Sequence, residues 1–120
     1  MRRDEKILVV EDNPTICQAI EEAGARLDIS CDCASDGWEA IEKLELEDYA
    51  AIFIDTDVPR HSGFGVLTYL REEVGDDLAN VILLTSATDH DDLRRRVGAD
   101  LRVVAKGDAV AEVTRVFGKA

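Results

Sequence analysis

The sequence predicts a single α/β domain over residues 1–120, with a doubly wound, five-stranded parallel sheet. Five short apolar runs alternate with segments of helical periodicity. The runs are apolar throughout rather than at every second residue, which is typical of parallel strands covered by helices on both faces. Right-handed crossovers leave few arrangements of five such strands, and the order 2-1-3-4-5 is the common one.

The first unit begins with a strand over Ile7–Val10, a short run rich in β-branched residues. Asn13 and Pro14 then open a helix, because Asn is a favoured N-cap and Pro suits the first helical position. A second, weaker strand covers Ile29–Ala34. The apolar residues expected on the inner face of the helix recur at helical spacing: Ile16, Ile20, Ala23 and Leu27.

The second and third units follow the same pattern. Asp36 and Glu39 predict a capping box at the start of a helix. The third strand, residues 50–54, ends at Asp55, and a loop then runs over residues 56–63. The side chains expected inside the second helix are Trp38, Ile41 and Leu44. Those expected inside the third helix are Val66, Leu67, Leu70 and Val74.

The last two units are shorter. The fourth strand, Val81–Leu84, ends at Thr85 and precedes a helix over about residues 88–97 with a thin apolar stripe. The fifth strand, Leu101–Ala105, ends at Lys106. Asp108 is expected to cap the last helix. The inner residues predicted for that helix are Val110, Val113 and Phe117.

Composition argues against several classes of function. The chain has 26 acidic and 14 basic residues and a net charge of −12, so we expect no binding to nucleic acid. No apolar stretch approaches the ~20 residues of a membrane span, and no signal peptide is visible. Three cysteines, an odd number, favour a reducing cytoplasmic environment. We interpret Cys31 and Cys33 as packed strand residues rather than half of a metal site.

Polar side chains follow four of the predicted strands: Glu11, Asp12, Asp55, Thr85 and Lys106. Parallel α/β sheets bind ligands at the carboxyl ends of their strands, so these side chains are expected to converge. Carboxylates ~5 Å apart repel by roughly 3 kcal/mol per pair at an effective dielectric of about 20, which calls for a cation. Carboxylate oxygen atoms are the kind of ligand that Mg²⁺ prefers, so Mg²⁺ is the expected cation. A carboxylate, a divalent ion, a hydroxyl and a lysine are what phosphoryl transfer to a carboxylate requires.

The order and spacing of these motifs resemble the receiver domain of two-component response regulators, of the single-domain chemotaxis type, over the whole chain. The matching segments are VVEDN at residues 9–13, DTDVPRHSG at 55–63, LLTSA at 83–87, GAD at 98–100, and Lys106. The resemblance implies a flavodoxin-like fold with Asp55 as phosphoacceptor. It also implies that Mg²⁺ is held by Glu11, Asp12, Asp55 and the main-chain carbonyl of Asp57, and that Thr85, Ser86 and Lys106 bind the phosphoryl group.

The same resemblance implies the partners. A histidine kinase or histidine phosphotransferase would supply the phosphoryl group, and the chain would act by contacts with an unknown downstream protein. A homodimer is compatible with this scheme. The chain would be no enzyme beyond catalysing its own phosphorylation and dephosphorylation. The family's usual output face would include Arg94, Arg95, Arg96 and Val103.

Two departures from the family pattern concern the residues that would change conformation on phosphorylation. Lys106 is followed by Gly107 where receivers usually have Pro, and Val103 stands where the family has an aromatic residue. One alternative is therefore a pseudo-receiver, a binding module that works without phosphorylation. A less favoured alternative is a haloacid-dehalogenase-like phosphatase, because Asp55 and Asp57 also resemble that family's Asp-x-Asp motif.

The three consecutive arginines at residues 94–96 have a simple helical interpretation. Acidic residues 89, 91 and 92 precede them in the same predicted helix, and Gly98 follows. Acids in the first turn and bases in the last turn complement the helix dipole, and Gly commonly ends a helix. We favour this interpretation over an anion-binding patch, although the arginines also suit an acidic partner protein.

Overall fold

The computed structural model confirms the predicted fold class. It describes residues 5–56, 63–74, 78, 80–86, 90–97 and 101–118. Five parallel strands form one sheet in the order β2-β1-β3-β4-β5. The strands are β1 (Lys6–Val10), β2 (Ser30–Ala34), β3 (Ala51–Asp55), β4 (Val81–Thr85) and β5 (Arg102–Ala105). The helices are α1 (Pro14–Arg26), α2 (Gly37–Leu46), α3 (Gly63–Tyr69), α4 (His90–Val97) and α5 (Ala109–Phe117).

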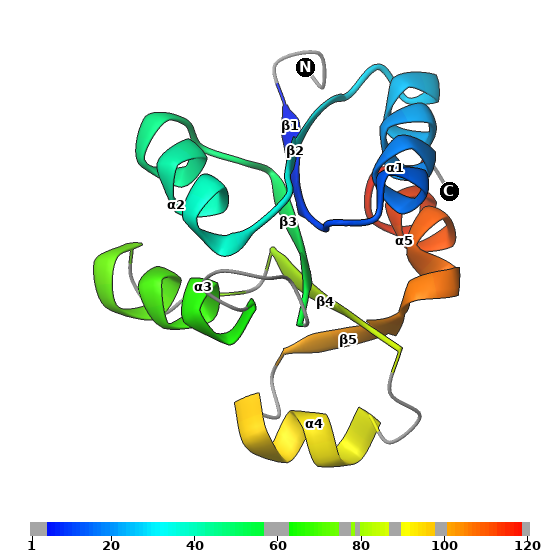
Figure 1. Cartoon of the computed structure of the whole chain (residues 1–120). Helices are drawn as coiled ribbons and strands as arrows, with labels where there is room; N and C mark the ends of the chain where they lie inside the picture. Colours follow the sequence, from blue (N-terminus) through cyan, green and yellow to red (C-terminus); the bar gives the residue numbers. More distant parts are fainter. Residues whose placement is uncertain are drawn as a thin grey trace.

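Helices cover both faces of the sheet (Figure 1), with α1 and α5 on one face and α2 and α3 on the other. Alternate residues of each strand enter opposite layers of the core. Leu8 and Val10 pack with the α2 and α3 side, where Leu93 of α4 also lies. Ile7 and Val9 pack with α1 and α5. This division explains why the strands are apolar throughout, since burying each such side chain contributes roughly 1.5–3 kcal/mol.

Two helix starts form as predicted. The Asn13 side chain accepts a hydrogen bond from the Thr15 backbone N–H at 2.9 Å, and Pro14 is the first residue of α1. Asp36 accepts from the Glu39 backbone N–H at 2.9 Å. The reciprocal bond of this cap is shifted by one residue, because Glu39 accepts from the backbone N–H of Ser35. Such N-caps typically contribute about 1 kcal/mol each.

The inward face predicted for α2 is wrong at Trp38, whose side chain is 59% exposed. The residues of α2 that are buried are Gly37 and Ala40, one turn apart. These small residues allow the helix axis to approach the sheet closely. The neighbouring Trp38 is rotated by about 100° around the axis, and therefore faces outward.

The prediction for α5 is wrong at Val110 and at the Asp108 cap, and it did not include Glu112. Val110 is 37% exposed, while Glu112 is 4% exposed and lies on the inner face with Val113 and Phe117. Asp108 makes no capping hydrogen bond through its side chain, because residues 106–108 form a 3₁₀ turn that runs directly into the helix.

The third helical segment also differs from a regular helix, since α3 is followed by a π-helical turn, Leu70–Val74. Several predicted strands begin one residue away from the observed start: β1 begins one residue earlier than predicted, and β2, β3 and β5 begin one residue later. Ile29 is buried but precedes β2, and Ala50 precedes β3. The described part of α4 begins at His90, and residues 88 and 89 of the predicted helix lie outside the described residues.

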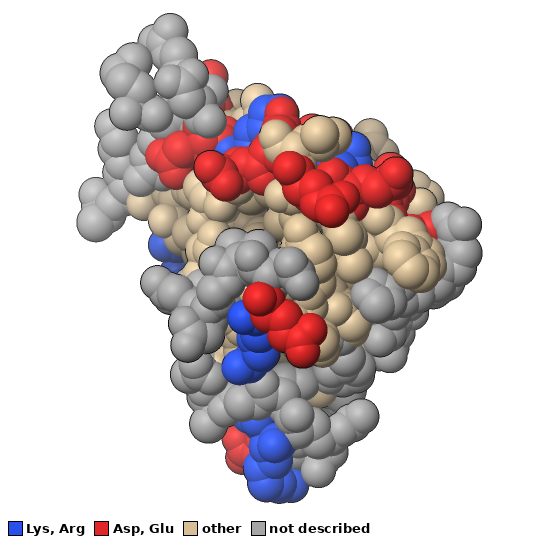
Figure 2. All heavy atoms as spheres, turned by 90° about the vertical axis from the view of Figure 1, so that its left-hand side faces the viewer, with Lys and Arg blue, Asp and Glu red and all other residues tan. Residues whose placement is uncertain are grey.

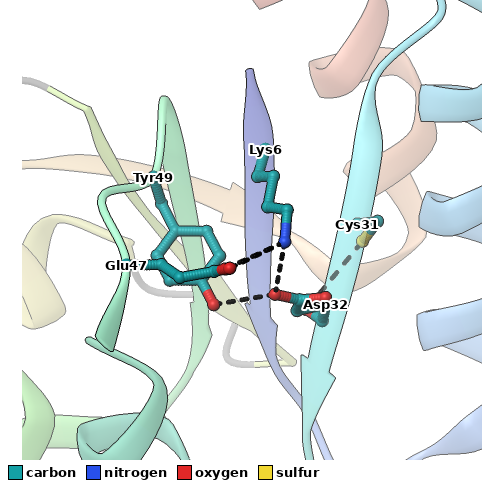
Figure 3. Close-up of polar contacts among 5 residues, drawn as sticks. All are labelled: Lys6, Cys31, Asp32, Glu47 and Tyr49. Atoms are coloured by element: carbon teal, nitrogen blue, oxygen red, sulfur yellow. Dashed lines mark hydrogen bonds and ion pairs between the residues drawn. The ribbon is translucent and has the colours of Figure 1, made fainter. Parts of the chain in front are cut away.

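A polar network joins the strands at the end of the sheet away from their carboxyl ends (Figure 3). Lys6 Nζ lies 2.9 Å from Glu47 Oε2 and 3.7 Å from Asp32 Oδ2. The Tyr49 hydroxyl donates a hydrogen bond of 2.8 Å to Asp32. Because β1, β2 and the segment before β3 each contribute to this network, it links the edge strand to the centre of the sheet.

None of the helices that the structure describes is long and apolar enough to cross a membrane.

Candidate functional site

Glu11 and Asp12 follow directly after β1 but occupy different environments. Glu11 is 2% exposed, and Asp12 is exposed. The Glu11 backbone N–H donates to the carbonyl of Ala34 at 2.9 Å, which ties it to the end of β2. The Glu11 carboxylate in turn accepts from the Asn13 backbone N–H at 3.2 Å. The start of α1 therefore holds this acid inside the fold.

Asp55 is the last residue of β3 and is 1% exposed. Oxygen atoms of Glu11, Asp12 and Asp55 all lie within 4.8 Å of one another. Within the described ranges, this is the one group of three or more acids, histidines or cysteines with such spacing. The structure thus brings together the three carboxylates that the strand-end argument selected.

Lys106 reaches the same place from the end of β5. Its Nζ lies 2.7 Å from Asp55 Oδ2 and 4.0 Å from Glu11 Oε2. The lysine side chain is 26% exposed, whereas both acids are almost completely buried. The ammonium group therefore offsets part of the negative charge and leaves one side of the cluster open to solvent.

Protonation offsets a further part of the repulsion. Burial, followed by the hydrogen bond and the charge of Asp55, raises the pKa of Glu11 to about 8. In the metal-free protein, this shift favours the protonated form of Glu11 more than in an exposed glutamate. A bound cation favours the ionised form, since carboxylates bind metals in that form.

The cluster fits a hard divalent cation. Glu11 Oε1 is a buried carboxylate oxygen with no hydrogen-bond partner among the described residues. A buried acceptor without a partner is unfavourable by about 1–3 kcal/mol, and a cation would relieve that cost. Three carboxylates, one of them exposed, also leave room for the water molecules that Mg²⁺ retains.

Thr85 ends β4 and is 2% exposed. Asp55 pairs in register with Leu84, so Thr85 lies one residue beyond the partner of Asp55 on the neighbouring strand. The backbone N–H of Thr56 donates to the Leu84 carbonyl at 3.2 Å and keeps these two strand ends together. Ser86 follows and is exposed. The main-chain carbonyl of Asp57, the remaining predicted metal ligand, lies outside the described residues.

The predicted output residues are only partly on the surface. Arg94 lies 3.2 Å from Asp91, one turn earlier in α4, which supports the helical interpretation of the arginine run. Arg95 is exposed, and the side chain of Arg96 lies outside the described set. Val103 is 5% exposed and packs in the core with Leu93, so it contributes from beneath α4 rather than as a surface contact.

The sequence did not predict Glu112, a buried acidic residue of α5 that pairs with β5. Glu112 of α5 accepts two hydrogen bonds from Arg102 of β5 and two from Arg115 of α5, all between 2.8 and 3.0 Å. Arg115 lies three residues after Glu112, a spacing that brings side chains together on a helix. That spacing was a visible signal, but the contact with Arg102 depends on the packing of α5 on β5.

The molecule is thus an α/β domain in which an acidic cluster and a lysine lie together at the carboxyl end of a parallel sheet. The family model described as the response regulator receiver domain matches residues 7–107. The chain therefore belongs to the response regulator receiver domain family.

Curated relatives are regulators of greater length. The chain is 32% identical over 113 residues to the transcriptional activator protein IrlR of Burkholderia pseudomallei, which covers 92% of this chain and 48% of that protein. It is 34% identical over 111 residues to the gliding motility regulatory protein of Myxococcus xanthus, covering 90% and 14%. The chain thus spans about half or less of these relatives.

Solved structures show the same fold. The chemotaxis response regulator CheY4 of Vibrio cholerae superposes with a TM-score of 0.77 at 21% identity, covering 93% of this chain and 98% of that one. The receiver domain of the sensor histidine kinase PA1611 of Pseudomonas aeruginosa superposes with a TM-score of 0.73 at 24% identity, covering 96% of this chain and 98% of that one. The latter is described with a magnesium ion coordinated in its active site cleft.

Proposed function

We propose that this chain is a phosphorylation-activated receiver in which Asp55 accepts a phosphoryl group from a phosphohistidine. The observation that carries the proposal is the position of the Asp55 carboxylate. It is buried at the end of the central strand β3, 2.7 Å from Lys106 Nζ and within 4.8 Å of two further acids. Of the two described acids in this cluster that pair with Lys106, Asp55 lies nearer to the ammonium group, at 2.7 Å against 4.0 Å for Glu11.

The proposed step is an in-line transfer. An Asp55 oxygen forms a bond to phosphorus while the P–N bond of the donor histidine breaks, and the imidazole nitrogen keeps the electron pair and takes a proton from solvent. Lys106 offsets the charge on the phosphoryl oxygens. Thr85 would donate its hydroxyl to one of these oxygens. The catalysis of the chain would be limited to its own phosphorylation and dephosphorylation.

Glu11, Asp12 and Asp55 would hold Mg²⁺, with the Asp57 main-chain carbonyl as a further ligand by family resemblance. When bound, the ion would neutralise negative charge on the transferred group. Glu11 has its unpartnered oxygen available for this purpose, and the exposed Asp12 faces the solvent side. Support from relatives is the magnesium ion described for the PA1611 receiver domain.

The charge distribution supports separate surfaces for different partners. Figure 2 shows acidic side chains gathered in a band on the face that carries α2 and α3, and basic ones at the end where α4 lies. Exposed acids of α2 and the segment after it include Glu42, Glu45, Glu47 and Asp48. We propose that a histidine kinase or phosphotransferase donates at the strand ends, and that an acidic surface of a downstream protein contacts α4.

The three free cysteines support a cytoplasmic setting for this exchange.

Intact mass spectrometry after incubation with Mg²⁺ and acetyl phosphate tests the proposal. We expect the protein to gain the mass of one phosphoryl group, and Asp55→Asn to gain none while keeping its fold. Asp48→Asn is the matched control, because it removes an exposed acid outside the cluster and should be phosphorylated like the parent. A parent protein that never gains the phosphoryl mass would favour the pseudo-receiver instead. Equal phosphorylation of Asp55→Asn would overturn the assignment of Asp55.

A further inference from the structure

The three cysteines of the chain come together on one face of the sheet. Cys31 and Cys33 alternate along β2, so their side chains point to the same side, which is the side covered by α1. Figure 3 shows Cys31 next to Asp32 on this strand. Cys17 lies on the buried face of α1 and packs in the same core layer as both strand cysteines.

Backbone contacts place Cys17 beside the end of β2. Cys17 Sγ donates to the carbonyl oxygen of Glu11 at 3.6 Å, and the Glu11 backbone N–H donates to the carbonyl of Ala34 at 2.9 Å. Ala34 directly follows Cys33. One residue of the β1–α1 turn thus contacts both Cys17 and the strand end that carries Cys33.

The three thiols differ in exposure and in acidity. Cys17 is 7% exposed, whereas Cys33 and Cys31 are half-buried and reachable from solvent. Hydrogen bonds from Cys17 and then from Cys31 lower the pKa of the Cys33 thiol, while burial opposes that shift. The interaction with Cys33, followed by burial, raises the pKa of Cys17. Both its exposure and the direction of this shift make Cys33 the more reactive thiol, with buried Cys17 as its neighbour.

We propose that Cys33 and Cys17 form a dithiol site that a hydroperoxide oxidises to a disulfide. The Cys33 thiolate attacks the O–O bond, which gives a sulfenic acid on Cys33 and releases an alcohol, or water from hydrogen peroxide. The Cys17 sulfur then attacks the Cys33 sulfur, the S–O bond breaks, and water leaves with the Cys17 proton. In total, two thiols and one hydroperoxide give one disulfide, one alcohol and one water.

Strand geometry selects Cys17 over Cys31 as the partner. Residues two apart on a strand have Cα atoms about 6.6 Å apart and parallel Cβ vectors, near the limit for a disulfide. Cys17 lies on the buried face of α1 in the same core layer as Cys33, so a Cys17–Cys33 disulfide would join two facing elements rather than neighbours on one strand. A metal site of three thiolates is less supported, because the described thiols do not form a group with all sulfur atoms within 4.8 Å.

The experiment treats the reduced full chain with hydrogen peroxide, then blocks free thiols and maps disulfides by peptide mass spectrometry. We expect one intramolecular disulfide, Cys17–Cys33, in the parent and in the matched control Cys31→Ser. Cys33→Ser should form none. Cys17→Ser should accumulate sulfenic acid on Cys33, detected with dimedone, because its resolving thiol is gone.

Three results would overturn the inference. They are a parent that forms no intramolecular disulfide, a disulfide that maps to Cys31 and Cys33, and dimedone labelling of Cys17→Ser that does not fall on Cys33. The parent and the Cys31→Ser control keep the test decisive if Cys33→Ser does not fold. The outcome does not depend on phosphorylation of Asp55.

Discussion

Replacing Asp12 with Asn tests the repulsion within the carboxylate cluster. At 4.8 Å, two unit charges repel by about 3.5 kcal/mol at an effective dielectric of ~20 and by about 0.9 kcal/mol in water. Asp12 is exposed and Lys106 neutralises part of the charge on Asp55, so the lower figure applies. We expect Asp12→Asn to raise the free energy of unfolding of the metal-free protein by about 0.5–1 kcal/mol, or roughly 2–5 °C in melting temperature.

Thermal unfolding in a chelator measures the effect of Asp12→Asn on the metal-free protein, and unfolding across a Mg²⁺ series measures its effect on metal binding. The parent should gain melting temperature with Mg²⁺, because an ion bound only to the folded state stabilises it by mass action. Asp12→Asn should begin higher in chelator and lose most of that Mg²⁺-dependent gain. Asp48→Asn is the control, since it changes net charge equally but lies outside the cluster.

Each competing explanation has its own signature. An Asp12→Asn protein that melts below the parent in chelator would show that Asp12 stabilises the start of α1, and the repulsion argument would be wrong. Equal stabilisation by Asp48→Asn would point to the net charge of −12 rather than to the cluster. An undiminished response to Mg²⁺ would remove Asp12 from the ligand set.

Two further predictions concern the α5 region. Burial opposes ionisation of Glu112, but hydrogen bonds from Arg102 and Arg115 outweigh it and lower the pKa of Glu112 from 4.5 to about 2. The pairing should therefore stabilise the folded state fully above about pH 4.5, and this stabilisation should vanish as the pH falls toward 2. The full pKa shift corresponds to about 3 kcal/mol, but the two arginine side chains are 50% and 54% exposed, so solvent screening reduces it. Glu112→Gln should therefore lower the free energy of unfolding by about 1–2 kcal/mol in urea at pH 7. An equal loss at pH 2 would contradict this prediction. Gly107→Ala should raise the free energy of unfolding by about 0.4–1 kcal/mol, because a Cβ there meets nothing within 4 Å, and a loss of stability in the same assay would show strain at this turn.

The sheet could be predicted from sequence because each strand carries its own signal. Residues such as Ile7 and Leu8 enter opposite core layers, so a continuous apolar run is the direct result of two covered faces. The helix faces were harder to predict. The side of α2 that meets the sheet is set by Gly37 and Ala40, and hydrophobicity alone assigned that side to Trp38. The rotation of a helix depends on how closely it packs, which a residue pattern does not contain.

The candidate site shows the same division. Its members could be chosen from sequence because parallel strands end at one edge, so position after a strand implies proximity. The burial and the charge pairing of each residue could not be predicted in this way. Of the adjacent residues Glu11 and Asp12, the first is buried and the second exposed, and buried Glu112 is paired partly by Arg102, which reaches it from another element. Both outcomes depend on contacts between segments that are far apart in the chain.

The difference between Glu11 and Asp12 also sets the direction from which the proposed site can be entered. Folding has already removed Glu11 and Asp55 from water, so a cation that binds them displaces little further solvent on that side. Asp12 remains exposed and Lys106 is partly exposed, so water and an incoming phosphoryl group have access past these two residues. For the proposed transfer, we expect a donor histidine to approach along the Asp12 and Lys106 side, where the ammonium group attracts the phosphoryl oxygens and the exposed carboxylate repels them unless a cation is bound. We therefore expect the proposed transfer to depend on a bound cation, because Asp12 lies beside this approach.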